Sequence, residues 1–266
     1  MIVSELYFMP FPSYSHPTIR KPTRLITHLL LSLGLVCVMS SVAWAQDVSA
    51  PSIADKSTYL SDIGKLCHID WPNNRVVTII CHGHSVPAGY FQTPEVHSLE
   101  AYPNLLRVGL AGKYPHAVIN VIVTAIGGEN SEQGAQRFDG DVLAHHPDVV
   151  TIDYAINDRG IGLQRARQAW VSMIEKALAA HVKVLLLTPT PTLGLNFDDA
   201  NDPLNQHAGQ IRDLAAKYHV GLVDSLAAFK KEVQSGTPLP DLMSLSVHPN
   251  GKGHQLVGEA LLEWFP

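Results

Sequence analysis

The sequence predicts an α/β protein, a three-layer α/β/α sandwich built around a five-stranded parallel sheet. Short apolar runs rich in valine and isoleucine alternate with longer segments whose apolar residues recur at helical spacing. Strands written as near-continuous apolar runs are typical of a parallel sheet that helices cover on both faces. The part of the chain with this alternation contains no repeat and no low-complexity linker. We therefore expect it to form one domain.

The predicted elements alternate in chain order. Residues 75–81 form the first strand, and the strongly β-branched run "AVINVIVTA" at 117–125 forms the second. Three further apolar runs complete the sheet: 149–154, 182–188 and 220–223. Segments with apolar residues three or four positions apart are the predicted helices: 99–114, 132–145, 163–181, 206–218, 226–233 and 253–264. Residues 46–60 are small and polar, and we expect a loose tail there.

The first 45 residues differ from the rest. Arg20, Lys21 and Arg24 precede an apolar run at 25–38, and small residues ending in Ala45 follow it. A basic region, a short apolar region and an A-x-A site predict a secretory signal peptide cleaved after Ala45. The alternative is an uncleaved anchor, but the run is shorter than the roughly 20 apolar residues of a bilayer-spanning helix. We expect a secreted or periplasmic protein whose mature domain is 46–266, with no membrane association after cleavage.

Composition and charge exclude some partners. The chain is 46% apolar and 16% charged with a formal net charge of −5, so it has no basic footprint for nucleic acid. Cys67 and Cys81 remain after signal cleavage, and in an oxidising compartment they could pair. Cys81 ends a predicted buried strand, where a free thiol behaves as a small apolar residue. We therefore favour two free thiols.

Polar residues and glycines follow the predicted strands. In parallel α/β sheets, ligands bind outside the carboxyl ends of the strands. The first strand is followed by Gly83-His84-Ser85, the second by Gly127-Gly128, and the third by Asn157-Asp158 in "IND". His248, in "HPN", stands just before the last predicted helix. The sequence therefore predicts an active site at this edge of the sheet.

In order and spacing, these four blocks resemble the signature of the SGNH (GDSL-type) hydrolases. The blocks are "GHS" with Ser85, the glycine at Gly128, "IND" with Asn157 and "HPN" with His248, and the resemblance extends from about residue 75 to the C-terminus. It implies the flavodoxin-like SGNH hydrolase fold for the domain at 46–266. Each residue alone has a structural explanation, such as a helix cap or a turn; the joint placement favours the functional one.

The resemblance implies a role for each residue. Ser85 is the nucleophile and His248 the general base, and the oxyanion hole consists of the N–H groups of Ser85 and Gly128 and the side-chain amide of Asn157. An ester carbonyl needs a nucleophile, a base and donors for the oxyanion that forms. A residue without a Cβ, such as Gly128, also lets the backbone approach a substrate closely. No cofactor and no metal are implied.

Two positions depart from the family pattern. His84 stands where the family usually has an aspartate before the serine, and Leu245 stands where it usually has one three residues before the histidine. The usual triad acid orients the imidazole and stabilises the imidazolium. Three replacements are open. In the first, a Ser–His dyad, a backbone carbonyl or the Ser246 hydroxyl accepts the hydrogen bond from His248 Nδ1. In the second, a carboxylate from elsewhere, such as Asp158 or Glu129, takes that place. In the third, the protein is a poor or inactive hydrolase. We favour the dyad and name no triad acid.

Residues beside the blocks are candidates for a supporting role: His84, Glu129, Asp158 and Ser246. His82 and His84 would share one face of an extended segment, which suggests a metal site. Two ligands are too few for zinc, however, which needs three or four. We favour His84 packing beside the nucleophile and donating a hydrogen bond to a neighbouring loop. Asp158 and Arg159 are expected to form an ion pair that fixes their loop.

The function expected is a secreted serine esterase that hydrolyses short, acetyl-like acyl esters, with a small-molecule or carbohydrate ester as substrate. The first alternative is a lipase, lysophospholipase or thioesterase of the same family. The alternative of another class is a non-catalytic carbohydrate-binding protein on the same scaffold, which the missing acid suggests. Acyl transfer to a sugar hydroxyl is a further possibility, since one fold serves many reactions.

Overall fold

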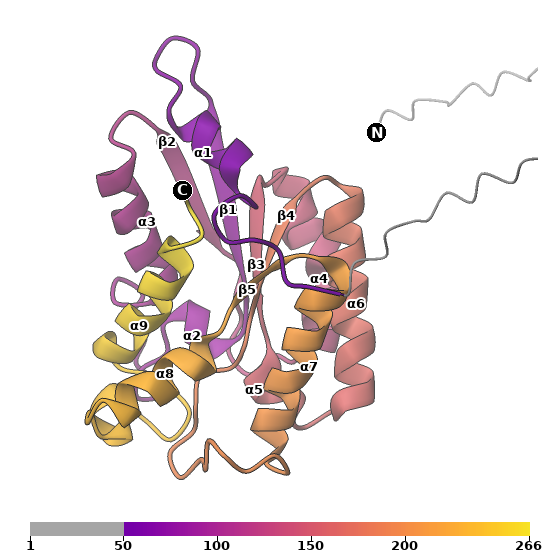
Figure 1. Cartoon of the computed structure of the whole chain (residues 1–266), viewed down its shortest axis with the longest axis vertical. Coiled ribbons are helices and arrows are strands. Elements are labelled where there is room, and N and C mark those ends of the chain that lie inside the picture. The colour runs from indigo at the N-terminus through magenta and orange to yellow at the C-terminus, as the bar shows by residue number, and fades with distance from the viewer. Residues whose placement is uncertain (1–50) are drawn as a thin grey trace, which may run out of the picture. The chain divides into compact units, whose positions relative to one another are not determined.

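The structure is a computed structural model that describes residues 51–266. The predicted signal peptide and its cleavage site at Ala45 lie outside the described residues. One five-stranded sheet of parallel strands runs through the domain, with helices on both faces, so the predicted α/β fold is confirmed (Figure 1). The strands are β1 (Val76–Gly83), β2 (Val118–Val123), β3 (Val149–Asp153), β4 (Lys183–Leu187) and β5 (Gly221–Val223). Their order in the sheet is β2-β1-β3-β4-β5.

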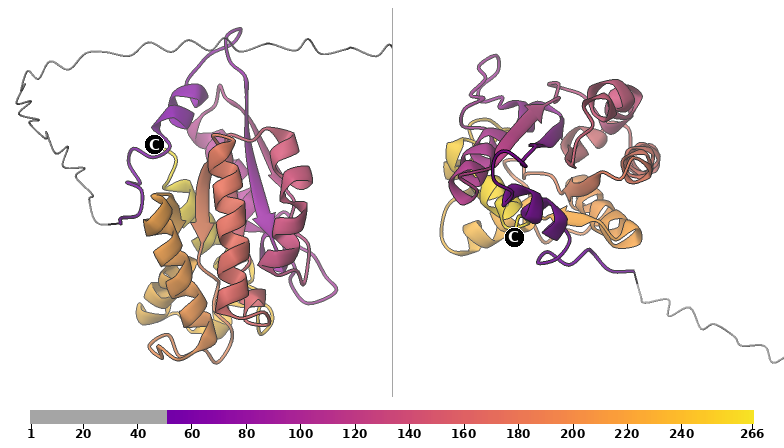
Figure 2. Two further views of the ribbon diagram at one scale, coloured as in Figure 1. Left: turned by 90° about the vertical axis from the view of Figure 1, so that its right-hand side faces the viewer. Right: turned by 90° about the horizontal axis from the view of Figure 1, so that it is seen from above.

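Two groups of helices cover the sheet. One face carries α1 (Ser61–Cys67), α3 (Tyr102–Lys113), α8 (Ser225–Gln234) and α9 (Gly251–Leu262). The other carries α4 (Ser131–Asp141), α6 (Leu163–Ala179) and α7 (Pro203–Tyr218). Two four-residue helices, α2 (Ser85–Ala88) and α5 (Ala155–Asp158), lie at the carboxyl ends of β1 and β3. Figures 1 and 2 show the sheet between the two groups.

Strand β1 forms the centre of the core because it pairs with β2 on one side and β3 on the other. Successive side chains of a strand point to opposite faces of the sheet. Ile79 and Cys81 accordingly pack in the cluster with α3 and α9, while Ile80 packs in the cluster with α4 and α6. Apolar burial on both faces explains why β1 reads as a near-continuous apolar run.

Several short segments differ from the sequence prediction. Helix α1 falls in a stretch for which no element was predicted, and α2 and α5 are single turns, too short to show a periodic pattern. The predicted loose tail is wrong at its end: Ala54 and Leu60 are buried, and the Ala54 N–H donates to Val220 O over 3.2 Å. Ala54 and Leu60 pack in the core cluster on one face of the sheet, which the mostly small and polar composition of 46–60 does not indicate.

The two cysteines in the described part of the chain are both buried and form no disulfide, which agrees with the expectation of free thiols. Burial raises the pKa of the Cys81 thiol to about 12, so this group is an inert part of the core. Between residues 51 and 266, every helix is too short or too polar to cross a lipid bilayer.

Candidate active site

The last residue of β1, Gly83, is a glycine because there is no room for a side chain there. A Cβ on Gly83 would lie 2.5 Å from the backbone oxygen of Asp153 and 2.7 Å from Cγ of Pro87. The chain then turns directly into α2, whose first residue is Ser85. The close approach of β1, β3 and α2 therefore places the Ser85 side chain at the carboxyl edge of the sheet.

Ser85 and His248 are 163 positions apart in the sequence and meet at this edge. The distance from His248 Nε2 to Ser85 Oγ is 3.0 Å, and both residues are buried, with 6% of the histidine and 8% of the serine exposed. His248 precedes α9, which is capped by the Asn250 side chain accepting from the N–H groups of Lys252 and Gly253. The geometry allows Nε2 to take the Ser85 hydroxyl proton.

A backbone carbonyl lies at the other nitrogen of the imidazole. His248 Nδ1 is 3.1 Å from the oxygen of Phe91. Because a carbonyl only accepts, Nδ1 carries the proton and Nε2 is left free to accept from Ser85. Leu245, at the family's acid position, is exposed, and the Ser246 carbonyl accepts from the Leu193 N–H over 2.8 Å. The structure thus has a Ser–His pair oriented by the main chain.

The Phe91 carbonyl is itself held in place by Ser244. The Ser244 Oγ lies 3.0 Å from Phe91 O, 3.2 Å from His248 O and 3.1 Å from Pro249 O. A hydroxyl has one proton, so it donates to one of these acceptors at a time. The Ser244 N–H also donates to His248 O over 2.9 Å. Ser244 therefore anchors the histidine loop to the segment that orients the imidazole.

The predicted oxyanion residues come from three segments: Ser85 begins α2, Gly128 lies on the loop after β2, and Asn157 belongs to α5. Gly128 has φ +82°, a left-handed conformation that favours glycine, and no atom lies within 4 Å of the place where its Cβ would be. The Asn157 Nδ2 donates one hydrogen to the oxygen of Glu129 over 2.8 Å. An amide nitrogen has two hydrogens, so the second is free for a substrate. The loop is also tied to the nucleophile strand, because the Ile126 N–H donates to Gly83 O over 3.0 Å.

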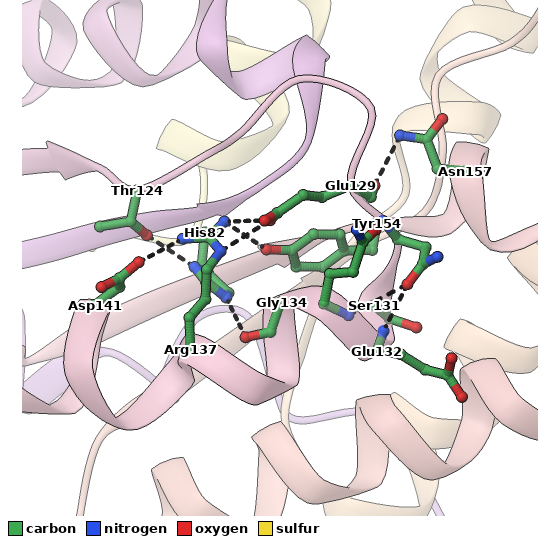
Figure 3. Close-up of polar contacts among 12 residues, drawn as sticks. His82, Thr124, Glu129, Ser131, Glu132, Gly134, Arg137, Asp141, Tyr154 and Asn157 are labelled. Carbon is green, nitrogen blue, oxygen red and sulfur yellow. Dashed lines mark hydrogen bonds and ion pairs between the residues drawn. The ribbon is translucent and has the colours of Figure 1, made fainter.

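The Glu129 carboxylate is engaged in a charged network with Arg137 of α4 (Figure 3). This carboxylate is 2.7 Å from Arg137, which also pairs with Asp141 at 2.9 Å and donates to the Tyr154 hydroxyl over 3.0 Å. His82 lies in the same cluster, its Nδ1 2.8 Å from Thr124 Oγ1 and its Nε2 3.1 Å from Gly134 O. This network holds the loop that carries Gly128 and Glu129 against α4.

Asp158 is also engaged elsewhere. Its carboxylate accepts from the Ser131 N–H and the Trp170 indole N–H, both over 2.7 Å. Burial raises the pKa of the Asp158 carboxyl. The expected ion pair with Arg159 is wrong: the Arg159 guanidinium donates to Ile156 O over 2.8 Å. Asp158 fixes its loop through neutral donors, because a buried carboxylate accepts N–H groups that would otherwise be unpaired.

His84 does not donate to a neighbouring loop as expected. Its Nδ1 accepts the N–H of Val86 over 3.1 Å, and its Nε2 lies 3.3 Å from Oδ1 of Asp153. Sequence reasoning missed Asp153, although its place at the end of β3 could have drawn attention to it. Both nitrogens of His82 and both of His84 face protein groups, and residues 51–266 contain no cluster of three or more metal-ligating side chains.

The pKa of His248 determines the pH range in which Ser85 can be deprotonated. Burial lowers this pKa below its ordinary value of 6.5, and the hydrogen bond to the Phe91 carbonyl opposes the shift. Only the neutral imidazole accepts a proton, so activity is retained at neutral pH and lost as the pH falls through the lowered pKa. We expect a profile of kcat/KM against pH whose acid limb has a midpoint below about 6.5. A midpoint above about 7 would contradict this assignment.

Comparison with known proteins agrees with this geometry. The sequence model of the GDSL-like Lipase/Acylhydrolase family matches residues 81–256. An acetylxylan esterase from Geobacillus stearothermophilus is 27% identical over 165 residues, which are 58% of this chain and 75% of that protein.

Solved structures show the same fold. The crystal structure of Axe2, the acetylxylan esterase of Geobacillus stearothermophilus, matches with a TM-score of 0.63 and 23% identity, covering 71% of this chain and 94% of that one. LAE5, an alpha/beta hydrolase enzyme from the metagenome of Lake Arreo, Spain, matches with a TM-score of 0.63 and 21% identity over the same shares. The family model spans Ser85, Gly128, Asn157 and His248, and on that basis the chain belongs to the GDSL-like lipase/acylhydrolase family and is a serine carboxylic ester hydrolase.

Proposed function

We propose that this esterase removes short acyl groups, acetyl above all, from carbohydrate esters through a Ser85 acyl-enzyme. The observation that carries the proposal is the contact of 3.0 Å between His248 Nε2 and Ser85 Oγ, with Phe91 O accepting at Nδ1. The substrate class is supported by the acetylxylan esterase to which the chain is similar. Variants of that enzyme in which a serine or a histidine is replaced by alanine are described as catalytic mutants.

The reaction proceeds in two halves. His248 Nε2 accepts the hydroxyl proton as Ser85 Oγ bonds to the ester carbonyl carbon, and the protonated imidazole then gives its proton to the departing alcohol oxygen. In the second half His248 takes a proton from water as the water oxygen bonds to the acyl carbon. The imidazolium then returns that proton to Ser85 Oγ as the acyl–oxygen bond breaks, which releases the carboxylic acid and restores the free enzyme. The Phe91 carbonyl fixes the tautomer but carries no negative charge, so it stabilises the imidazolium less than a carboxylate would.

The oxyanion formed in each half needs donors. The N–H groups of Ser85 and Gly128 and the free hydrogen of Asn157 Nδ2 are proposed for this role. Two observations support this assignment. Gly128 has a left-handed conformation, and the hydrogen bond from Asn157 Nδ2 to Glu129 O holds the amide beside the Gly128 loop. Donors fixed before the reaction need no reorganisation as charge develops.

Export is part of the proposal and rests on the sequence of residues 1–45. The basic region, the apolar run and Ala43-Trp44-Ala45 support a secreted or periplasmic enzyme, with the mature domain at 46–266. N-terminal sequencing of the protein from the extracytoplasmic fraction tests it, and a mature protein that begins at Gln46 is the expected result.

A series of p-nitrophenyl esters tests the acyl preference. We expect kcat/KM to be highest for acetate and to fall as the acyl chain lengthens, and we expect release of acetate from acetylated xylo-oligosaccharides. A preference for long acyl chains, octanoate and above, would support a lipase instead. Transfer of the acetyl group to an added sugar, faster than to water, would support an acyltransferase. The Ser85→Ala variant, measured in parallel, separates enzymatic from spontaneous hydrolysis.

A further inference from the structure

We propose that Asp153 and His84 act together as positioning residues for the nucleophile, a role that rests on the proposed function of Ser85. Asp153 holds the His84 ring in the tautomer whose Nδ1 caps the turn that carries Ser85. The family pattern has an aspartate directly before the serine. In this chain the carboxylate beside that position comes from Asp153, at the end of the neighbouring strand β3.

The cap is the first step. His84 is the N-cap residue of α2 (Ser85–Ala88), and its Nδ1 accepts the Val86 N–H over 3.1 Å. N-cap positions are usually filled by serine, threonine, aspartate or asparagine, whose oxygen accepts this bond. The aspartate of the family pattern at this position would be an ordinary cap. An imidazole can replace it only while the nitrogen that faces Val86 carries no proton.

The tautomer is the second step. A neutral imidazole has one N–H and one acceptor nitrogen, so Nδ1 can accept only when the proton is on Nε2. That nitrogen lies 3.3 Å from Oδ1 of Asp153, with side-chain exposures of 1% and 4%. Nε2 has no aligned hydrogen bond to any described side chain or backbone group, so the contact with Asp153 is electrostatic. Since a buried carboxylate attracts the N–H dipole, it favours the Nε2–H tautomer.

The position of Asp153 is fixed by the sheet. Asp153 is the last residue of β3 and pairs in register with Gly83, the residue before His84. Its other oxygen, Oδ2, accepts from the Tyr102 hydroxyl of α3 over 3.2 Å. Burial, together with nearness to the negative charge of Asp153, raises the pKa of Tyr102 and keeps its proton on the hydroxyl. The carboxylate is therefore held by groups from two elements, and its direction toward His84 does not depend on a flexible loop.

The pair explains why this chain can lack the family aspartate before Ser85. An aspartate at position 84 would face Asp153 across a few ångströms of buried space, and two like charges there could not both stay ionised. The imidazole gives the cap without a second negative charge. The two positions should therefore be coupled: a carboxylate is tolerated at one of them only if the other is neutral.

A double-mutant cycle tests the coupling. The single variant His84→Asp should lower kcat by about 30-fold, because like charges distort the turn under the nucleophile. The single variant Asp153→Asn should lower it less, by about threefold to tenfold, since an amide oxygen still faces Nε2 but lacks the negative charge that favours the Nε2–H tautomer. The double variant His84→Asp/Asp153→Asn should recover activity to within about tenfold of the wild type. KM should stay near the wild-type value throughout. A double variant no more active than His84→Asp alone overturns the proposal.

Two further variants test the proposal if His84→Asp does not fold. His84→Asn keeps a cap oxygen and should retain kcat within about fivefold, whereas His84→Leu has no acceptor and should lose at least about tenfold. Wild-type turnover in His84→Leu overturns the proposal. The rate of labelling by a fluorophosphonate, which reports the reactivity of the serine hydroxyl, should follow kcat in every variant.

Asp224→Asn is the matched control. Asp224 follows β5 at the same edge of the sheet, caps α8 by accepting the Ala227 N–H over 3.1 Å, and pairs with Arg212. Its loss should lower Tm and leave kcat unchanged. If it lowers kcat as much as His84→Leu, the effect is a general one of stability and the proposal fails. A wild-type protein without esterase activity would instead refute the proposed function, so the two failures are distinguishable.

Discussion

Replacing Ser85 by alanine should reduce kcat on p-nitrophenyl acetate by about 10⁴- to 10⁶-fold and leave the fold intact. The Ser85 hydroxyl lies 3.0 Å from His248 Nε2 and supports no other side chain of the described domain, so its removal breaks no structural bond. His248→Ala should cost about as much, and the double variant no more than either single one, because the two residues act as a unit. Equal Tm values for wild type and variants, together with lost turnover, would be the expected outcome.

Labelling distinguishes the nucleophile from other serines. A fluorophosphonate should add one phosphonyl group to the wild-type protein, with loss of fluoride, and none to Ser85→Ala. Ser225 is the matched control: it is buried, lies just after a strand and is the first residue of a helix, as Ser85 is. Ser225→Ala should be labelled like the wild type. Labelling that survives in Ser85→Ala would place the nucleophile elsewhere.

The fold could be predicted because its signal is local. Runs such as 117–125 and 149–154 are β-branched and apolar, as expected of strands buried on both faces. Once the strands are placed, the residues that follow them can be expected at one site, because the carboxyl ends of parallel strands lie at the same edge of the sheet. Ser85, Gly128, Asn157 and His248 were singled out in this way, and each lies just after a strand or just before α9.

The contacts that could not be predicted depend on groups without a sequence signature. Phe91 orients His248 through a carbonyl oxygen that every residue has, so nothing in its side chain reveals the contact. Asp153 faces His84 because the register of β1 and β3 pairs it with Gly83, and register is a property of the assembled sheet. The single turns α2 and α5 have four residues each, fewer than a periodic apolar pattern needs.

Both departures from the family pattern have the same physical form. At His248 a carboxylate has been replaced by the Phe91 carbonyl, and at position 84 a carboxylate has been replaced by an imidazole. In each case a neutral group now accepts the hydrogen bond. At position 84 the negative charge is not lost, because the Asp153 carboxylate lies 3.3 Å from His84 Nε2. At His248 the neutral Phe91 carbonyl adds no negative charge that would oppose formation of an oxyanion. The cost is a less stabilised imidazolium at His248.

Replacing Asn157 by alanine should lower kcat by about 10²- to 10³-fold, with a small change in KM. One oxyanion donor is worth about 3 to 4 kcal/mol in the barrier, because the bond is made to charge that exists only in the transition state. The Asn157 amide also donates to Glu129 O over 2.8 Å, so its removal can act through movement of the Gly128 loop as well. A crystal structure of the variant shows whether that loop has moved.

Asn130→Ala separates the two causes. Asn130 lies on the same loop, and its side chain caps α4 by accepting from the N–H groups of Glu132 and Gln133. Losing this cap should cost about 1 kcal/mol of stability and loosen the loop while leaving the Asn157 donor in place. We expect a lower Tm with kcat within about threefold of the wild type. If Asn157→Ala is no worse than Asn130→Ala, the amide serves only as a tether, and the oxyanion is bound by the two backbone N–H groups.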